Sequence, residues 1–271
     1  MNQNIFFRIL QGKFKLKELR GYLLIITILF FIPLFISLSL YPKELEYSVM
    51  KDMVSYLGSW DKNPRGYQFF NFSFIFLGFA YFPLIQYLHR RISVPRCKWF
   101  AICGTIFLIL SAIGIIGIGF FPDADGKNLF GIEGRKIHFD FAYLAVIGFL
   151  AGMICYIEII VEDYIAMLRN KQNYFDFKKF KIPIIYFLLF FIGLIATQIY
   201  AKNHFVRPYP GFFSKSMWEW TIFMSSFFEM YSFSILLPNH IPVEIDYKNY
   251  ILGLIKDDKN LLESSIEVSP P

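Results

Sequence analysis

The chain has 271 residues, of which 56% are hydrophobic, 20% aromatic and only 18% charged, and its net charge is +6. A soluble domain is typically about 45–50% apolar and about 25% charged, so this composition argues against an ordinary water-soluble domain. The three cysteines lack the close spacing of a disulfide framework or a zinc motif.

Six apolar stretches have the length that a membrane span requires, about 20 residues. They cover residues 21–41, 67–88, 99–121, 139–161, 182–200 and 218–237. Apolar runs of this length are poor strands, and no period-two alternation competes with them. The sequence therefore predicts an all-α membrane protein built as a bundle of six transmembrane helices.

Lysine and arginine are unevenly distributed between the connections. The N-terminal segment and the second and fourth connections hold 14 of the 27, whereas the first, third and fifth hold 10, mixed with acids. Because short cytoplasmic loops gather cations, we expect both termini in the cytoplasm. Residues 1–20 then form a basic cytoplasmic leader, residues 21–240 the membrane domain and residues 241–271 a cytoplasmic tail.

The same distribution explains the basic charge without nucleic acid. The expected partners are membrane lipids, and the expected location is the cell membrane. The leader could lie in the membrane interface as an amphipathic helix or remain solvated.

Small residues recur at helical spacing in the third and fourth spans. Lipid gives helices no hydrophobic reason to associate, so such stripes favour close packing of the two helices as an antiparallel pair. The residues are Ser111, Gly114 and Gly117 in one span and Ala145, Gly148, Ala151 and Gly152 in the other.

Most unusual polar residues fall at the expected outer ends of the spans. Ionisable groups inside a membrane are costly and usually face a bundle interior or a cavity, so we expect an outward-facing polar pocket. The candidate ligand-binding residues are Ser55, Asn71, Asp123, Asp125, His138, Asp140, Glu219 and, near the middle of the last span, Glu229.

Several of these residues also have a purely structural interpretation. His138 and Asp140 could cap a helix at the interface, and Asp123 and Asp125 could form a solvated turn. A protonated Glu229 could bond to a neighbouring helix. Because helix residues turn by about 100° each, His138 and Asp140 should diverge by about 200°, which leaves Asp123, Asp125 or Glu219 as nearer partners for the imidazole.

No cofactor or metal is predicted. Only two of the four histidines, His138 and His204, fall at the outer face, and no zinc-binding HExxH or HxxxH pattern is present.

The order of several motifs resembles a known family. Ser55 and Gly58 in "VSYLGSW", Asn71 and Gly78 in "NFSFIFLG", and "GFFPDADG" leading to His138 in "IHFDFAYLAVIGF" are similar to the prokaryotic six-span proteins of domain-of-unknown-function family 998. These proteins are in turn similar to the eukaryotic Frag/DRAM/Sfk-like membrane proteins. The resemblance covers roughly residues 20–238 and implies a membrane fold, with lipid organisation, lipid remodelling or autophagy as functional directions. Near the sixth span, Glu229 stands where a Gly…Arg element is expected.

Three functional hypotheses follow. The first is a protein without enzymatic activity whose outer pocket binds a lipid headgroup or organises lipids. The second is a membrane-embedded lipid hydrolase or transferase that uses His138 with Asp123, Asp140 or Glu219, which requires an acid, a base and an electrophile around one point. The third is a small proton-coupled carrier that uses Glu229, which requires a cavity across the midplane.

Overall fold

The structure is a computed structural model that describes residues 5–93, 98–124, 128–129, 132–169, 175, 178–202 and 214–237. Its long helices are α2 (Leu16–Ser39), α3 (Tyr67–Ile92), α4 (Lys98–Phe120), α5 (Gly134–Leu168), α6 (Lys181–Lys202) and α7 (Lys215–Leu236). The short elements are α1 (Ile5–Leu10), η1 (Lys43–Leu45), η2 (Val54–Gly58), β1 (Asn128–Leu129) and β2 (Ile132–Glu133). The prediction of a helical protein is confirmed.

Five of these helices, α2 to α6, are long and apolar enough to cross a membrane. The last helix, α7, has a comparable length of 22 residues but is not among these five. Polar residues explain the difference: Ser225, Glu229 and Ser234 are all buried in the described part of the molecule. The exposed side of α7 carries large apolar residues instead, Phe228 and Ile235.

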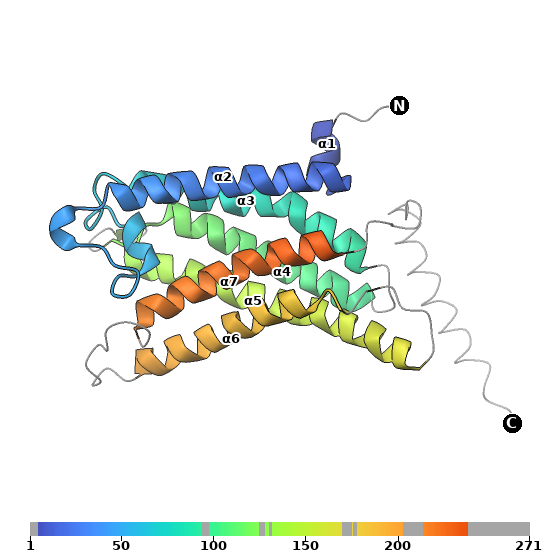
Figure 1. Cartoon of the computed structure of the whole chain (residues 1–271). Coiled ribbons are helices and arrows are strands. Elements are labelled where there is room, and N and C mark those ends of the chain that lie inside the picture. Colours follow the sequence, from blue (N-terminus) through green and yellow to red (C-terminus); the bar gives the residue numbers. More distant parts are fainter. Residues whose placement is uncertain are drawn as a thin grey trace, which may run out of the picture. The chain divides into compact units, whose positions relative to one another are not determined.

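The helices run alternately up and down, and Figure 1 shows the start of α2 and the end of α7 at the same end of the bundle. Close contacts join α2 to α3, where the Tyr22 hydroxyl donates to the Ala80 carbonyl over 2.8 Å. The last helix, α7, packs against α2 through aromatic rings, since Phe30 of α2 contacts Phe223 and Phe227 of α7 at centroid distances of 5.4 and 5.7 Å. The opposite end, where α2, α4 and α6 end and α3, α5 and α7 begin, is called the hairpin end below.

The predicted packing of small residues between α4 and α5 is confirmed. A Cβ atom on Gly114 would lie 2.4 Å from the Ala145 nitrogen, and one on Gly148 would lie 2.8 Å from the Ser111 nitrogen. The Ser111 hydroxyl also donates to the Ala145 carbonyl oxygen over 2.7 Å. The two backbones therefore touch where the side chains are smallest.

Helix α5 is longer than predicted and begins before His138. The sequence suggested a start near residue 139, but a ribbon that pairs Asn128 with Glu133 and Leu129 with Ile132 turns the chain, and the helix starts directly after it. His138 is consequently a helical residue, and the spacing rule for His138 and Asp140 applies to both.

The N-terminal segment is packed against the bundle. Helix α2 begins at Leu16, inside the predicted leader, and Arg8 of α1 forms an ion pair with Glu18. The Phe14 ring contacts the rings of Tyr22 and Tyr87, at centroid distances of 5.0 and 5.7 Å. Described residues up to Leu237 belong to one compact unit.

Candidate functional site

The connection between α2 and α3 is folded tightly onto the hairpin end. Asn63 is fully buried, and its side-chain nitrogen lies 3.0 Å from the carbonyl oxygens of both Ser37 and Leu57. Its side-chain oxygen accepts from the Gly66 amide over 3.1 Å. Nearby, a Cβ on Gly58 would lie 2.3 Å from the Phe70 ring, which explains the glycine there. These contacts hold η2, and therefore Ser55, in a fixed place.

The same connection is attached to the start of α7. The Ser216 hydroxyl donates to the Lys51 carbonyl over 2.8 Å, and Trp220 Nε1 donates to the Tyr47 hydroxyl over 3.2 Å. The Tyr47 hydroxyl lies 3.2 Å from the Met53 carbonyl, to which it donates. Burial raises the pKa of Tyr47 above its ordinary value, so this phenol remains a neutral donor.

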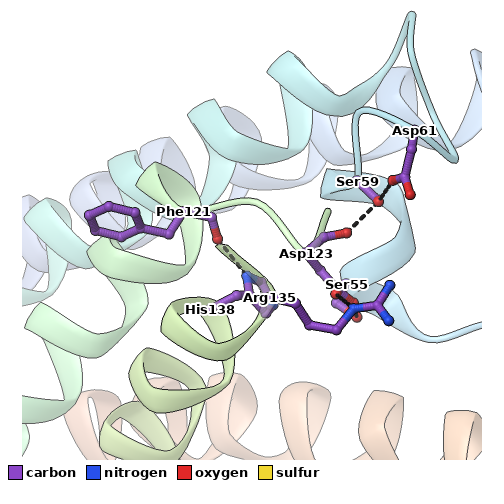
Figure 2. Close-up of polar contacts among 7 residues, drawn as sticks. All are labelled: Ser55, Ser59, Asp61, Phe121, Asp123, Arg135 and His138. Atoms are coloured by element: carbon purple, nitrogen blue, oxygen red, sulfur yellow. Dashed lines mark hydrogen bonds and ion pairs between the residues drawn. The ribbon is translucent and has the colours of Figure 1, made fainter. Parts of the chain in front are cut away.

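Asp123 links the α2–α3 connection to α5 at the lip of the bundle (Figure 2). Its carboxylate is 2% exposed and receives the Ser55 hydroxyl at 3.1 Å and Arg135 Nε at 3.0 Å. The Ser59 hydroxyl lies against both the Asp123 carbonyl oxygen and the Asp61 carboxylate. A hydroxyl has one hydrogen, so it serves one of these acceptors at a time. Asp123 is thus a buried ionic crosslink rather than a solvated turn residue.

His138 is 3% exposed, and its ring orientation is fixed by a carbonyl group. Nδ1 lies 2.7 Å from the Phe121 oxygen, so Nδ1 carries the proton and donates (Figure 2). The prediction of a carboxylate partner is therefore wrong for this hydrogen bond. The reason is that Asp123 is already engaged by Arg135 and Ser55. In the neutral ring, the other nitrogen, Nε2, remains a hydrogen-bond acceptor.

His138 lines a cavity of about 190 Å³ at the hairpin end. Its described polar wall residues lie on five different elements, and the rest of its wall is mostly aromatic and aliphatic. The polar residues are Ser55, Tyr81, Ser111, His138, Glu219 and Ser226. The cavity therefore combines hydrogen-bonding groups with an apolar surround, as small-molecule sites commonly do.

A second, larger space of about 580 Å³ lies between α5, α6 and α7. We call it the α5–α6 groove. Its walls are mainly apolar, including Ile147 and Leu150 of α5 and Phe191 and Ile195 of α6, with Gln198 as a polar wall residue. The groove and the cavity share five wall residues, so the two spaces adjoin. The shared residues are Phe139, Ala142, Val146, Glu219 and Ile222.

The predicted site residues divide into two sets. Ser55, His138 and Glu219 line the cavity, and Asp123 supports it through Ser55. Asp140 is exposed on the other side of α5, as the helical spacing predicts. The structure does not place the others at the cavity wall, and Asp125 lies outside the described residues.

Two of these remaining residues place polar oxygen atoms inside the bundle. Asn71 has a buried side-chain oxygen, and Glu229 is fully buried. Within the described ranges, neither that oxygen nor the Glu229 carboxyl oxygens have a hydrogen-bond partner. Glu229 lies three residues after Ser226 on α7, so it continues the buried face of that helix below the cavity.

Sequence reasoning missed Ser59 and Arg135. Ser59 shares the motif "VSYLGSW" with Ser55, and Arg135 lies three residues before His138. That spacing places Arg135 and His138 on one helical face once α5 is known to start at Gly134. Among the residues that the structure describes, no group of three or more His, Cys, Asp and Glu residues could hold a metal ion.

Apolar helices of membrane-spanning length and a polar cavity at one end define an α-helical membrane protein. Residues 24–212 match the family described as "Protein of unknown function (DUF998)", and the chain belongs to that family. The match ends before α7, so Glu219 and Glu229 lie beyond it. No protein with a curated description and no solved structure matches the chain.

Proposed function

We propose that this protein is a six-span protein of the cell membrane, with the hairpin end outside, and that its cavity binds the headgroup of a lipid. The sixth span would be α7. Its buried residues include Ser225, Glu229 and Ser234, whereas Phe228 and Ile235 are exposed. A membrane helix with polar residues inside and apolar residues outside has this arrangement.

The orientation rests on the cations. Helices α3 and α5 end, and α4 and α6 begin, away from the hairpin end. The N-terminal segment and the sequence between these helix ends hold 14 of the 27 lysines and arginines. The positive-inside rule then assigns the hairpin end to the outer face.

The observation that carries the binding proposal is the oriented imidazole of His138. The ring is almost fully buried, its Nδ1 is held by the Phe121 carbonyl, and it forms part of the cavity wall. A buried polar side chain that is oriented by the protein and lines a cavity is well suited to hydrogen-bond a ligand. Ser55 donates its hydrogen to Asp123, so the geometry favours binding over a serine nucleophile activated by His138.

The test compares His138→Ala with His138→Asn in the full-length purified protein. The side-chain amide of asparagine can still donate to the Phe121 carbonyl, so this variant separates folding from ligand contact. Co-purifying lipids are measured by mass spectrometry after extraction. Both variants should lose at least half of a lipid that the wild type retains, and His138→Asn should unfold near the wild-type temperature.

The control is Asp140→Ala, which alters an exposed carboxylate on the opposite side of α5. It should retain lipid as the wild type does. If His138→Asn folds and keeps the full lipid complement, the binding proposal is wrong. Conversion of the retained lipid by the wild type, and not by His138→Asn, would favour the hydrolase or transferase instead.

A further inference from the structure

The serine hydroxyl groups around the cavity direct their hydrogens into the protein. Ser111 donates to the Ala145 carbonyl over 2.7 Å, Ser226 to the Phe223 carbonyl over 2.8 Å, and Ser55 to the Asp123 carboxylate over 3.1 Å. A hydroxyl has one hydrogen and two acceptor lone pairs. Each of the three oxygens can therefore offer only acceptor capacity to a ligand while these bonds persist.

The other polar wall groups extend this pattern. His138 donates through Nδ1 to Phe121, which leaves Nε2 as an acceptor in the neutral ring. Glu219 contributes a carboxyl group where the cavity meets the α5–α6 groove. Tyr81 contributes a hydroxyl that can donate, and the described wall includes neither lysine nor arginine. The cavity is therefore rich in acceptors and poor in donors.

The α5–α6 groove has the length of a lipid chain in one leaflet. Its wall on α5 runs from Phe139 to Leu150. At 1.5 Å per residue this stretch is about 16 Å long, close to half of the roughly 30 Å hydrocarbon core of a bilayer. Because the groove adjoins the cavity, a chain lying in the groove would have its headgroup beside His138 and Ser55.

We infer that the ligand is an amphiphile whose headgroup donates hydrogen bonds through hydroxyl or amino groups and whose acyl chain lies in the α5–α6 groove. This inference rests on the proposed lipid-headgroup function and specifies its ligand class. The described wall residues include no cationic side chain, so a phosphate or carboxylate headgroup would bring its acceptor atoms against acceptor atoms of the protein. Such a contact is unfavourable when water is excluded. Access would be lateral, from the outer leaflet.

The experiment uses two photoactivatable probes with the same diazirine-bearing acyl chain, a monoacylglycerol and a lysophosphatidic acid. Each is titrated against the full-length protein in nanodiscs of uncharged lipid, and labelling is quantified by mass spectrometry. The monoacylglycerol should label peptides of α5 and α6 and bind at least about tenfold more tightly, the difference of one or two hydrogen bonds. Equal or tighter binding of the phosphate probe would overturn the headgroup class.

The position of the chain is tested with Ala142→Trp, which places an indole where cavity and groove meet. This variant should reduce monoacylglycerol labelling at least about tenfold. Its matched control is Ile25→Trp, which lies on the exposed side of α2 and should label like the wild type. Thermal unfolding of both variants verifies that they fold. Full labelling of a folded Ala142→Trp would overturn the groove assignment.

If Ala142→Trp does not fold, Ile195→Trp tests the same wall from α6. Failure of the inference differs from failure of the proposed function. If the lysophosphatidic acid binds tightly and His138→Asn abolishes this binding, the inferred headgroup class is wrong but the proposed headgroup site is supported. If either probe labels His138→Asn as strongly as it labels the wild type, the proposed headgroup site is wrong.

Discussion

Asp123 and Arg135 form an ion pair across the two ends of the α4–α5 connection, with 3.0 Å between Oδ1 and Nε. The carboxylate also receives the Ser55 hydroxyl and is almost fully buried. Asp123→Ala would leave both donors without this acceptor. Because about a third of Arg135 is exposed to solvent, we expect a moderate loss of about 1–3 kcal/mol in the free energy of unfolding in detergent.

Asp140→Ala provides the comparison for that measurement. Its carboxylate is exposed, so the change should be within about 0.5 kcal/mol of wild type. Similar losses for Asp123→Ala and Asp140→Ala would show that the buried crosslink does not stabilise the hairpin end.

The contact between α4 and α5 predicts the effect of Gly148→Leu. A Cβ at this position would lie 2.8 Å from the Phe107 carbonyl oxygen and 2.8 Å from the Ser111 nitrogen, both of which are backbone atoms. Backbone cannot rotate away as a side chain can, so the helices must separate. We expect a cost of about 1–3 kcal/mol, measured as a lower unfolding temperature in detergent.

Gly21→Leu is the matched control, because a Cβ on Gly21 meets no atom within 4 Å. This substitution should leave the unfolding temperature near that of wild type. The packing argument fails if the two leucine variants unfold at the same temperature.

The proposed orientation is tested by thiol labelling in intact cells, on a chain whose native cysteines are replaced. Cysteines at Asn128 and Ser214 should react with a membrane-impermeant reagent, because β1 and the start of α7 lie at the hairpin end. A cysteine at Asn173, outside the described residues, or at Arg169, at the end of α5, should react only after permeabilisation. The reverse pattern would place the cavity on the cytoplasmic side.

Two tyrosines should make the hairpin end sensitive to alkali. Burial raises the pKa of Tyr41 to about 12, and the negative charge of Asp52 adds to the shift. Burial also raises the pKa of Tyr47. An unfolded tyrosine has a pKa of about 10, so the folded state holds its phenol protons more tightly. The resulting stability is fully present below about pH 10 and is lost as the pH rises towards 12.

The measurement compares unfolding temperatures at pH 9 and pH 11.5 for the wild type and the double variant Tyr41→Phe, Tyr47→Phe. Other titrating groups are the same in both proteins, so the difference isolates the two phenols. The wild type should lose more stability than the double variant, and equal losses would contradict the prediction.

The helices were predictable because their signal is local. A membrane span is recognised from composition alone, and glycines that recur at helical spacing predicted the α4–α5 contact correctly. The residue at which α5 starts was harder to predict, because it depends on the ribbon between Asn128 and Glu133 and on the Asp123–Arg135 pair. Such interactions join residues that no periodic pattern connects.

The candidate site was predictable only as a list of polar residues at one end of the bundle. His138 donates to the Phe121 carbonyl and not to a carboxylate, because the Asp123 carboxylate is bound by Arg135. The α5–α6 groove arises from the way three helices meet, and each of these helices is apolar for reasons unrelated to the groove. Three-dimensional packing was therefore needed to convert the residue list into a site.

Glu229 provides the last prediction. It is fully buried in α7, and its carboxyl oxygens have no hydrogen-bond partner among the described residues. A buried polar group without a partner costs about 1–3 kcal/mol, so Glu229→Leu, which removes the group at similar size, should raise the free energy of unfolding by about that amount. Glu229→Gln keeps a polar side chain in the same place and should change stability much less.

Both variants are measured by thermal unfolding in one detergent, together with the lipid retained by each. A Glu229→Leu variant that unfolds earlier than wild type would mean that the carboxyl has a stabilising partner. A variant that is more stable but has lost its lipid would show that Glu229 is retained for function at the expense of stability.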